Sequence, residues 1–170
     1  GFSRVNWMEN ITNDMFYTHL SVKRQQFRFG LLAFNYGEQL ETDVNGIVTG
    51  NFTPSSSVWS LSWGGKIKKY NVGATAKLLS HDLYSQKALG VVFDVATYLP
   101  KVWRDLDVDV QLSNFGVAPK YNDFETMLPT SLNIAMTYPY KQWMFYEQYN
   151  IIKKFHTMGG GVMYNYNNQI

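Results

Sequence analysis

The chain has 170 residues, which is enough for one domain but hardly for two. Its net charge of +2 argues against a dedicated nucleic-acid binder. It contains no cysteine, which excludes disulfide scaffolds, thiolate metal sites and cysteine nucleophiles. Charged residues make up 16% of the chain, well below the ~25% of an average globular protein. No run of 18 apolar residues occurs, so the sequence predicts no membrane-spanning helix.

Apolar and polar residues alternate along most of the chain, a period typical of strands and not of helices. The segment Leu106–Ser113 is the clearest case, because every second residue from Leu106 to Leu112 is apolar. The predicted strands are about 8–12 residues long, which exceeds the 5–6 typical of soluble sheets and suits tilted membrane-spanning strands. The alternation predicts ten strands, at residues 2–8, 15–22, 27–36, 57–63, 71–80, 87–98, 105–113, 130–138, 142–150 and 156–166.

Short and longer connections alternate between these strands. The short ones lie near residues 23–26, 64–70, 100–104 and 139–141, and they are rich in Lys and Arg. The longer ones lie near residues 37–56, 81–86 and 114–129, with connections of middling length near 9–14 and 151–155. This pattern predicts an all-β fold, an antiparallel up-and-down meander with short turns at one end, as in outer-membrane β-barrels.

Aromatic residues cluster near the predicted strand ends, where the interfacial girdle of a membrane barrel would place them. A soluble β-sandwich would show the same alternation, with its strands paired across two sheets. A soluble carbohydrate-binding β-domain, with Trp and Tyr stacked on sugars, therefore stays an alternative. The clustered aromatic residues are Trp7, Tyr36, Trp63, Tyr70, Tyr98, Trp103, Tyr138, Tyr140 and Trp143.

In a barrel, the polar face of each strand would point into the lumen, because a basic side chain on the lipid side costs about 2–4 kcal/mol near the midplane, and an acid less. Leu106, Val108, Val110 and Leu112 are accordingly expected to face lipid. Lys77 and Arg28 could pair with the acids of the lumen. The charged residues predicted to face the lumen are Arg28, Lys77, Asp94, Asp107 and Asp109.

The sequence predicts neither an enzyme nor a cofactor. His19, His81 and His156 lie far apart without metal-ligand spacing, and nothing locates a Ser, His and acid set. The series Asp105-x-Asp107-x-Asp109 begins like a calcium loop, but the required Gly and bidentate Glu are replaced by Val110 and Gly116. The sequence therefore predicts no metal site.

Several stretches occur in an order and spacing that extends from about Trp7 to Tyr166. They are Phe29–Glu38, Thr42–Gly46, Thr49–Thr53, Val72–Lys77, Ser113–Gly116, and Met127–Pro129 leading into Leu132–Tyr138. Together they resemble the PorV/PorQ family of FadL-like outer-membrane β-barrels, most closely its PorQ-type members. The resemblance implies a transmembrane barrel of about 14 strands in the outer membrane of Bacteroidota. It also implies a link to type IX secretion and to attachment of cargo at the cell surface.

The chain departs from this family at both ends. The amino-terminal segment with its Asn-Pro-Ala motif is missing, and Ile170 is not the terminal aromatic residue of an outer-membrane chain. We therefore expect residues 1–170 to form a single β-barrel domain that lacks strands at both ends. The first strand should then not pair with the last.

Two functions follow from the resemblance: a non-enzymatic component of a surface complex in type IX secretion, or a FadL-like channel for hydrophobic small molecules. The expected partners are outer-membrane lipid and other proteins of the secretion or attachment complex. The long connections 37–56 and 114–129 are the candidate contact elements, and their acids would favour a basic partner surface. Alternatively, such a loop folds over the barrel mouth and plugs it. The candidate contact residues are Glu38, Glu41, Asp43, Phe52, Asp123 and Glu125.

Overall fold

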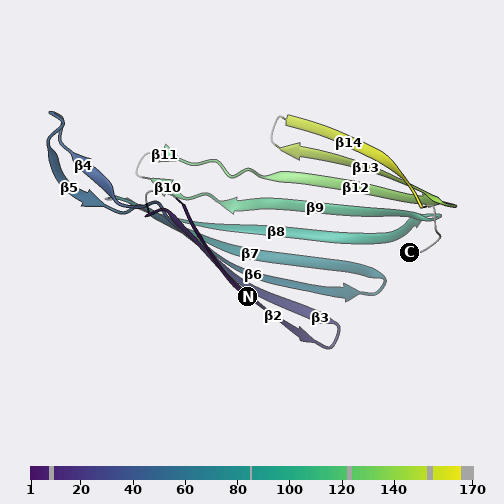
Figure 1. Cartoon of the computed structure of the whole chain (residues 1–170). Helices are drawn as coiled ribbons and strands as arrows, with labels where there is room; N and C mark the ends of the chain where they lie inside the picture. Colours follow the sequence, from purple (N-terminus) through teal and green to yellow (C-terminus); the bar gives the residue numbers. More distant parts are fainter. Residues whose placement is uncertain (8–9, 85, 122–123, 153–154, 166–170) are drawn as a thin grey trace.

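The computed structural model describes residues 1–7, 10–84, 86–121, 124–152 and 155–165, which form β-strands and connections without an α-helix (Figure 1). No helix long and apolar enough to cross a bilayer is found in this part of the chain. Ten strands build the main sheet: β1 (Phe2–Asn6), β2 (Thr12–Val22), β3 (Gln25–Asn35), β6 (Ser55–Ile67), β7 (Tyr70–Leu83), β8 (Gln86–Trp103), β9 (Leu106–Val117), β12 (Ser131–Tyr140), β13 (Trp143–Ile152) and β14 (Phe155–Tyr164).

The order of strands in this sheet follows the sequence, and every neighbouring pair is antiparallel. Two small hairpins interrupt the order: β4 (Gln39–Thr42) with β5 (Val48–Phe52), and β10 (Lys120–Tyr121) with β11 (Phe124–Glu125). The prediction of an all-β antiparallel meander with ten strands is confirmed. Among the described residues, β1 and β14 lie at opposite edges and do not pair, so the sheet is open.

One end of the sheet carries four two-residue turns, and each begins with a basic residue in the left-handed region. These residues are Lys23, Lys68, Arg104 and Lys141, with φ between 53° and 56°. Two-residue hairpins need such angles because the resulting turns match the right-handed twist of the strands. Gly, Asn and Asp adopt these angles most readily, so the turn geometry alone does not account for the Lys and Arg residues at this end.

Two connections at the opposite end are shorter than the sequence suggested. The register pairs Leu83 with Gln86 and Ile152 with Phe155, so strand pairing extends into the expected loops at 81–86 and 151–155. Asp82, a residue type common in loops, lies within strand β7 opposite Lys87 of β8, and its carboxylate lies 3.1 Å from Lys87 Nζ. In the sequence, the polar residue Asp82 suggested a loop, whereas in the structure it pairs with Lys87 across β7 and β8.

Strand β8 also continues through the turn expected at 100–104. The register between β8 and β9 shifts between Leu99 and Trp103, and Pro100 lies within this bulge. Proline fits a bulge because it has no N–H to donate to the ladder. The freed Lys101 N–H donates instead to the Asp107 carboxylate at 2.9 Å.

The cross-strand register divides the sheet into two chemically different faces. One row of paired residues consists of Phe16, Leu31, Trp59, Leu78 and Val91. Residues paired directly across antiparallel strands lie on the same face, so this row marks an apolar face. A row on the opposite, polar face consists of His19, Arg28, Ser62, Thr75 and Asp94.

The apolar face is not covered by a second layer in the described part of the chain. Only Ala88 and Val92 are buried apolar residues there, and the total accessible surface is 12816 Å². A compact globular protein of 19.6 kDa would expose about 8,600 Å². Large side chains such as Leu20, Leu61 and Leu89 are more than half exposed, so the sheet stands without a conventional hydrophobic core.

Replacing Gly116 with alanine should disrupt the β8–β9 pairing. Gly116 has φ +147°, and a Cβ there would lie 2.2 Å from the Val91 carbonyl oxygen. We expect Gly116→Ala to lower the free energy of unfolding by roughly 2–3 kcal/mol, measured by denaturant titration.

The matched control is Gly159→Ala, because a Cβ at Gly159 would meet no atom within 4 Å. This variant should unfold like the unchanged protein. Equal stability of the two variants would contradict the close approach of β8 and β9 at Gly116.

Candidate functional site

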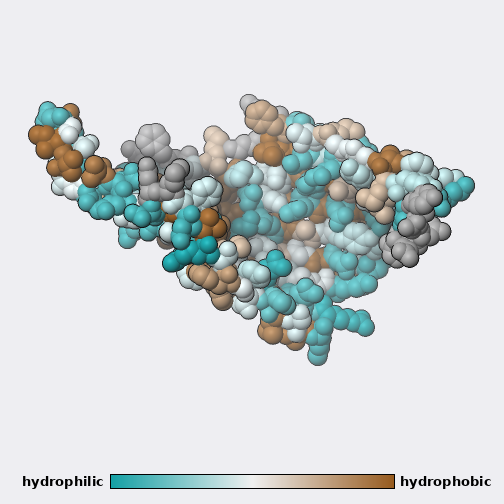
Figure 2. Space-filling view, viewed as in Figure 1, coloured by the Kyte–Doolittle hydropathy of each residue, from teal (hydrophilic) through white to brown (hydrophobic). Residues whose placement is uncertain are grey.

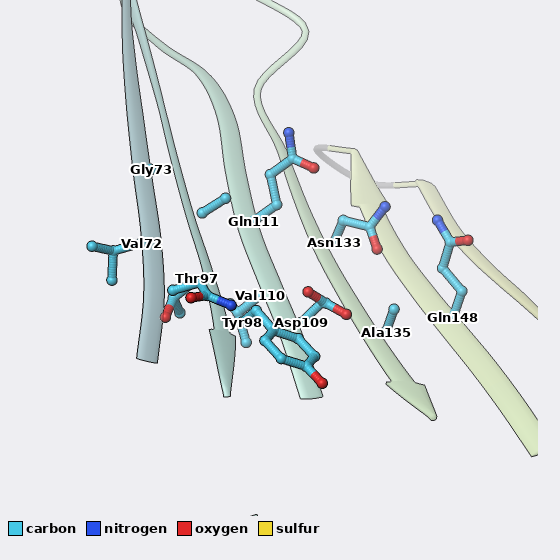
Figure 3. Close-up of a pocket in the computed structure, with 12 residues that line it drawn as sticks. Val72, Gly73, Thr97, Tyr98, Asp109, Val110, Gln111, Asn133, Ala135 and Gln148 are labelled. Atoms are coloured by element: carbon cyan, nitrogen blue, oxygen red, sulfur yellow. The ribbon is translucent and has the colours of Figure 1, made fainter. Parts of the chain in front are cut away.

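A hollow of about 450 Å³ lies on the polar face, across strands β7, β8, β9, β12 and β13 (Figure 3). The register places its side chains in adjacent rows, with Gln111 opposite Asn133 and with Asp109, Ala135 and Gln148 along one line. Small residues, Gly73, Ala96 and Ala135, leave the space that the longer side chains surround. The polar residues lining the hollow are Asn71, Tyr98, Thr97, Asp109, Gln111, Asn133 and Gln148.

The hollow offers hydrogen-bonding groups set in a lining that is otherwise mostly carbon. Its amides both donate and accept hydrogen bonds, and the Asp109 carboxylate accepts them. No Lys, Arg or His lines it, and no Ser, Cys or His is placed there to act as a nucleophile with a base. The arrangement can hold hydrogen-bonding solutes, but it contains no catalytic set.

The structure brings two of the predicted lumen residues, Lys77 and Asp94, into direct contact. Lys77 Nζ lies 2.6 Å from the Asp94 carboxylate and 3.0 Å from Asn114 Oδ1. The Asn114 N–H donates to Asp94 at 2.8 Å. Asn114 has a positive φ of 55° and lies where β9 bulges against β8. This cluster therefore fixes the bulge, a role that the alternation pattern did not indicate.

The other predicted lumen residues lie on the same face but do not join this cluster. Asp107 accepts a 2.5 Å hydrogen bond from the Tyr98 hydroxyl as well as the bond from Lys101 N–H. Asp109 lines the hollow. Arg28 lies in a separate recess beside His19 and makes no ion pair with a carboxylate in the described residues. The five residues thus share a face without forming one site.

The second long connection folds back over the polar face. Pro119 lies so close to Gly90 that a Cβ there would meet Pro119 Cδ at 2.7 Å. The ring of Tyr121 contacts His81 edge-on, with centroids 6.1 Å apart. Burial, followed by the nearby Tyr36 hydroxyl, raises the pKa of Tyr121. This connection covers Ala88 and Val92, which explains why these two residues are buried.

Two predicted contact residues belong to this connection. Asp123 lies outside the described residues. Glu125 is the last residue of β11, whose backbone pairs with β10. In the described part, the connection is held inward: Thr126 Oγ1 donates to the Pro119 carbonyl at 2.5 Å, and Thr130 Oγ1 to the Asn114 carbonyl at 2.7 Å.

The first long connection behaves differently, because its β4–β5 hairpin projects beyond the end of the sheet (Figure 1, left). Phe52 packs edge-on against Tyr84 from the β7–β8 turn, with ring centroids 5.0 Å apart. The Tyr84 hydroxyl also donates a hydrogen bond to the Glu41 carboxylate, and this bond raises the pKa of Tyr84. Tyr84 was not singled out by the sequence, since a lone tyrosine in a turn carries no distinguishing signal.

The acids of this hairpin are engaged within the hairpin or with its support. Glu38 accepts a 2.5 Å hydrogen bond from Asn51 Nδ2, and Glu41 is bound by Tyr84. Asp43 Oδ1 accepts the N–H groups of Asn45 and Ile47, each at 2.8 Å. None of these donors carries a positive charge, so the three carboxylates keep their negative charge, and their attraction for a basic partner surface stays a prediction.

Apolar side chains at the hairpin tip are exposed. Val44 is 101% exposed relative to its reference state, and Leu40, Ile47 and Val48 are each more than half exposed. Figure 2 shows brown, apolar patches along the projecting hairpin at the left. The surface that this hairpin offers is thus mainly apolar and carries no Lys or Arg.

Comparisons with known proteins add no relative. No protein-family model matches the chain, and neither a curated protein nor a solved structure is significantly similar to it. Among the described residues, no three His, Asp or Glu side chains are grouped closely enough to hold a metal ion. Functional inference consequently rests on the two faces, the hollow and the hairpin.

The turn at the hairpin tip should loosen in acid. Hydrogen bonds from Ile47 and Asn45 hold the pKa of Asp43 below its ordinary value, although partial burial opposes them. The stabilisation of the turn by the Asp43 carboxylate is therefore complete above the unfolded-state pKa of ~3.9. It is lost as pH falls through the lower folded-state pKa. Hydrogen exchange at the Asn45 and Ile47 amides, corrected for its intrinsic pH dependence, should accelerate across that interval.

The variant Asp43→Ala should exchange these two amides rapidly at neutral pH and should show no further acceleration in acid. Amides of the β4–β5 ladder provide the internal control. Equal protection of Asn45 and Ile47 in the variant and the unchanged protein would contradict this role of Asp43.

Proposed function

We propose that this sheet is part of an up-and-down, FadL-like transmembrane β-barrel in the Gram-negative outer membrane. Its apolar face would contact lipid and its polar face would line the lumen. The single observation that carries the proposal is the uncovered apolar face, which extends over the strands of a ten-stranded sheet. Contact with lipid removes such a face from water, and exposure to water costs a free energy of about 25 cal/mol for each Å² of apolar surface.

The alternative, a soluble carbohydrate-binding β-domain, fits this arrangement poorly. A β-sandwich buries the apolar faces of two sheets against each other. In the described residues, the only additional sheets are the short β4–β5 and β10–β11 hairpins, and neither covers the apolar face. A soluble form would leave Trp59, Leu61 and Phe93 exposed to water.

The strand ends agree with a membrane interface at the end with four tight turns. Tyr140, Trp143 and Tyr164 share one cross-strand row there, and the rings of Trp143 and Tyr164 are 4.7 Å apart. Arg104 lies over the Trp103 ring at 4.6 Å. Aromatic rings and basic side chains are typical of headgroup depth. By analogy with outer-membrane barrels, we assign this short-turn end to the periplasm and the hairpin end to the exterior.

Within this proposal, the protein acts without catalysis, as a component of a surface complex in type IX secretion and surface attachment. The resemblance to the PorV/PorQ family supplies the pathway, and the projecting hairpin supplies an element that could reach a partner. The rival channel for hydrophobic small molecules would need an apolar lumen. Amides and Asp109 line the hollow together with apolar atoms, so the hollow does not separate the two roles; the covering of another part of the polar face by residues 119–121 favours the first role.

Single cysteines on the two faces should report opposite environments in native membranes. The chain has no cysteine, so each introduced thiol is unique. A membrane-impermeant maleimide given access to both sides should label Gln111→Cys in the polar hollow and should not label Leu61→Cys, although Leu61 is 59% exposed in the isolated chain.

Labelling of both variants after denaturation controls for thiol reactivity. If Leu61→Cys reacts as readily as Gln111→Cys in intact membranes, the apolar face is in water and the membrane proposal fails.

Deleting Asp43–Gly50 should leave barrel assembly intact and weaken capture of surface partners at least several-fold. The deletion removes the turn and its exposed valines and isoleucine, while the Phe52–Tyr84 contact lies outside it. Heat-modifiable migration in gels measures assembly, and co-purification of surface complex proteins measures capture. The control is Lys68→Gly at the opposite end, since glycine tolerates the positive φ of that turn. Unchanged capture by an assembled deletion variant would refute the contact role of the hairpin.

A further inference from the structure

A groove of about 470 Å³ interrupts the apolar face near its β14 edge. Its walls come from neighbouring strands, and its floor is low because Gly160 of β14 lies directly opposite Glu147 of β13. A Cβ at Gly160 would lie 3.0 Å from the Tyr146 carbonyl oxygen and 3.7 Å from the Glu147 Cα, so glycine allows the close approach to β13 and leaves space beside the acid. The side chains that line the groove on this face are Leu106, Met136, Tyr138, Phe145, Glu147 and Met158.

Glu147 is unusual among the ionisable groups of the apolar face. Arg4 is paired with Asp14 at 2.5 Å, and Lys87 is paired with Asp82 at 3.1 Å. His156 shares a 2.7 Å hydrogen bond with the Tyr149 hydroxyl. Glu147, in contrast, makes no hydrogen bond or ion pair with any residue that the structure describes.

The position of Glu147 along its strand restricts what could satisfy it. Glu147 is the fifth residue of the ten-residue strand β13, whose first residue, Trp143, belongs to the aromatic row at the short-turn end. In the proposed membrane orientation, the carboxylate therefore lies near the middle of the hydrocarbon layer. Acyl chains at that depth offer no hydrogen-bond donor, and headgroups cannot reach it.

We propose that this groove binds a membrane-spanning segment of another protein, whose Lys or Arg side chain pairs with Glu147. The inference rests on the proposed membrane placement of the apolar face. The apolar walls accept the body of the segment, and the unpaired carboxylate selects a cation, since a charge within the membrane is normally paired. Binding would bury the acid of this face that has no partner among the described residues.

A second copy of this chain fits the groove less well. A symmetric contact between two copies would bring one Glu147 against the other, and like charges at short distance repel. The register places two cations on the apolar face, Arg4 and Lys87. Both already have acidic partners, and both lie toward the end of the sheet away from the four short turns. We therefore assign the cation to a different protein, and a crosslink to a strand of the same protein beyond the open β14 edge would contradict this assignment.

Photo-crosslinking in native outer membranes tests this inference with the full protein. A benzophenone amino acid replaces Met158, which lines the groove and is 72% exposed. We expect one membrane-protein adduct, with the crosslinked peptide in a spanning segment that contains Lys or Arg. Its yield should fall at least about tenfold with Glu147→Gln, which keeps the side-chain shape, and with Gly160→Leu, which fills the groove.

The control is Ala76→Leu, which adds three carbons, against four in Gly160→Leu, to the apolar face on the distant strand β7 and should leave the yield unchanged. Heat-modifiable migration verifies that each variant assembles. Exchanging the charges, with Glu147→Lys and an acid at the partner's cation, should restore the adduct.

Three results would overturn the inference: adducts with lipid alone, an adduct with a second copy, or an adduct insensitive to Glu147→Gln. None of these affects the proposed barrel, which fails separately if Leu61→Cys reacts with the impermeant maleimide. A captured protein whose crosslinked segment lacks a basic residue would also contradict the proposed pairing.

Discussion

The antiparallel hydrogen-bond ladder is the interaction on which the rest of this structure depends. With almost no buried core, the main sheet is held by its backbone bonds and by side-chain contacts between neighbouring strands. Phe29, for example, contacts Phe16 at 6.4 Å and Trp59 at 6.0 Å between ring centroids, which links three strands on the apolar face. A slip of one residue in any pair would exchange the apolar and polar faces, so register carries the whole distinction between them.

Two aspartates fix this register where β8 and β9 depart from regular pairing. Asp94 accepts the Asn114 N–H at the bulge of β9, and Asp107 accepts the Lys101 N–H at the bulge of β8. Bulges release backbone groups from the ladder, and a carboxylate can accept the freed N–H. Asp94 and Asp107 on the polar face thus stabilise the bulges, whether or not this face lines a lumen.

The sequence predicts the faces well because strand alternation has a period of two and is read without long-range information. Leu106, Val108 and Val110 illustrate this, since their face follows from spacing alone. The course of the long connections could not be predicted in the same way. Residues 37–56 project because Tyr84 supports Glu41 and Phe52, whereas residues 119–121 fold inward against Gly90 and His81. These contacts join segments far apart in sequence, and no local pattern announces them.

The same limit explains why the sequence pointed to the acidic residues of the hairpin and not to its exposed apolar side chains. Glu38, Glu41 and Asp43 accept hydrogen bonds within the hairpin or from Tyr84 and keep their charge, and the apolar area adds a second means of attraction. Full burial of four aliphatic side chains contributes about 6–12 kcal/mol, and association alone costs about 4–15 kcal/mol. The hairpin by itself would therefore bind weakly. A second contact within the membrane, as proposed for the groove beside Glu147, would make the first effectively intramolecular and could raise avidity by a factor of about 10²–10⁴. The two surfaces act together only if a partner complex spans the membrane and also extends above it.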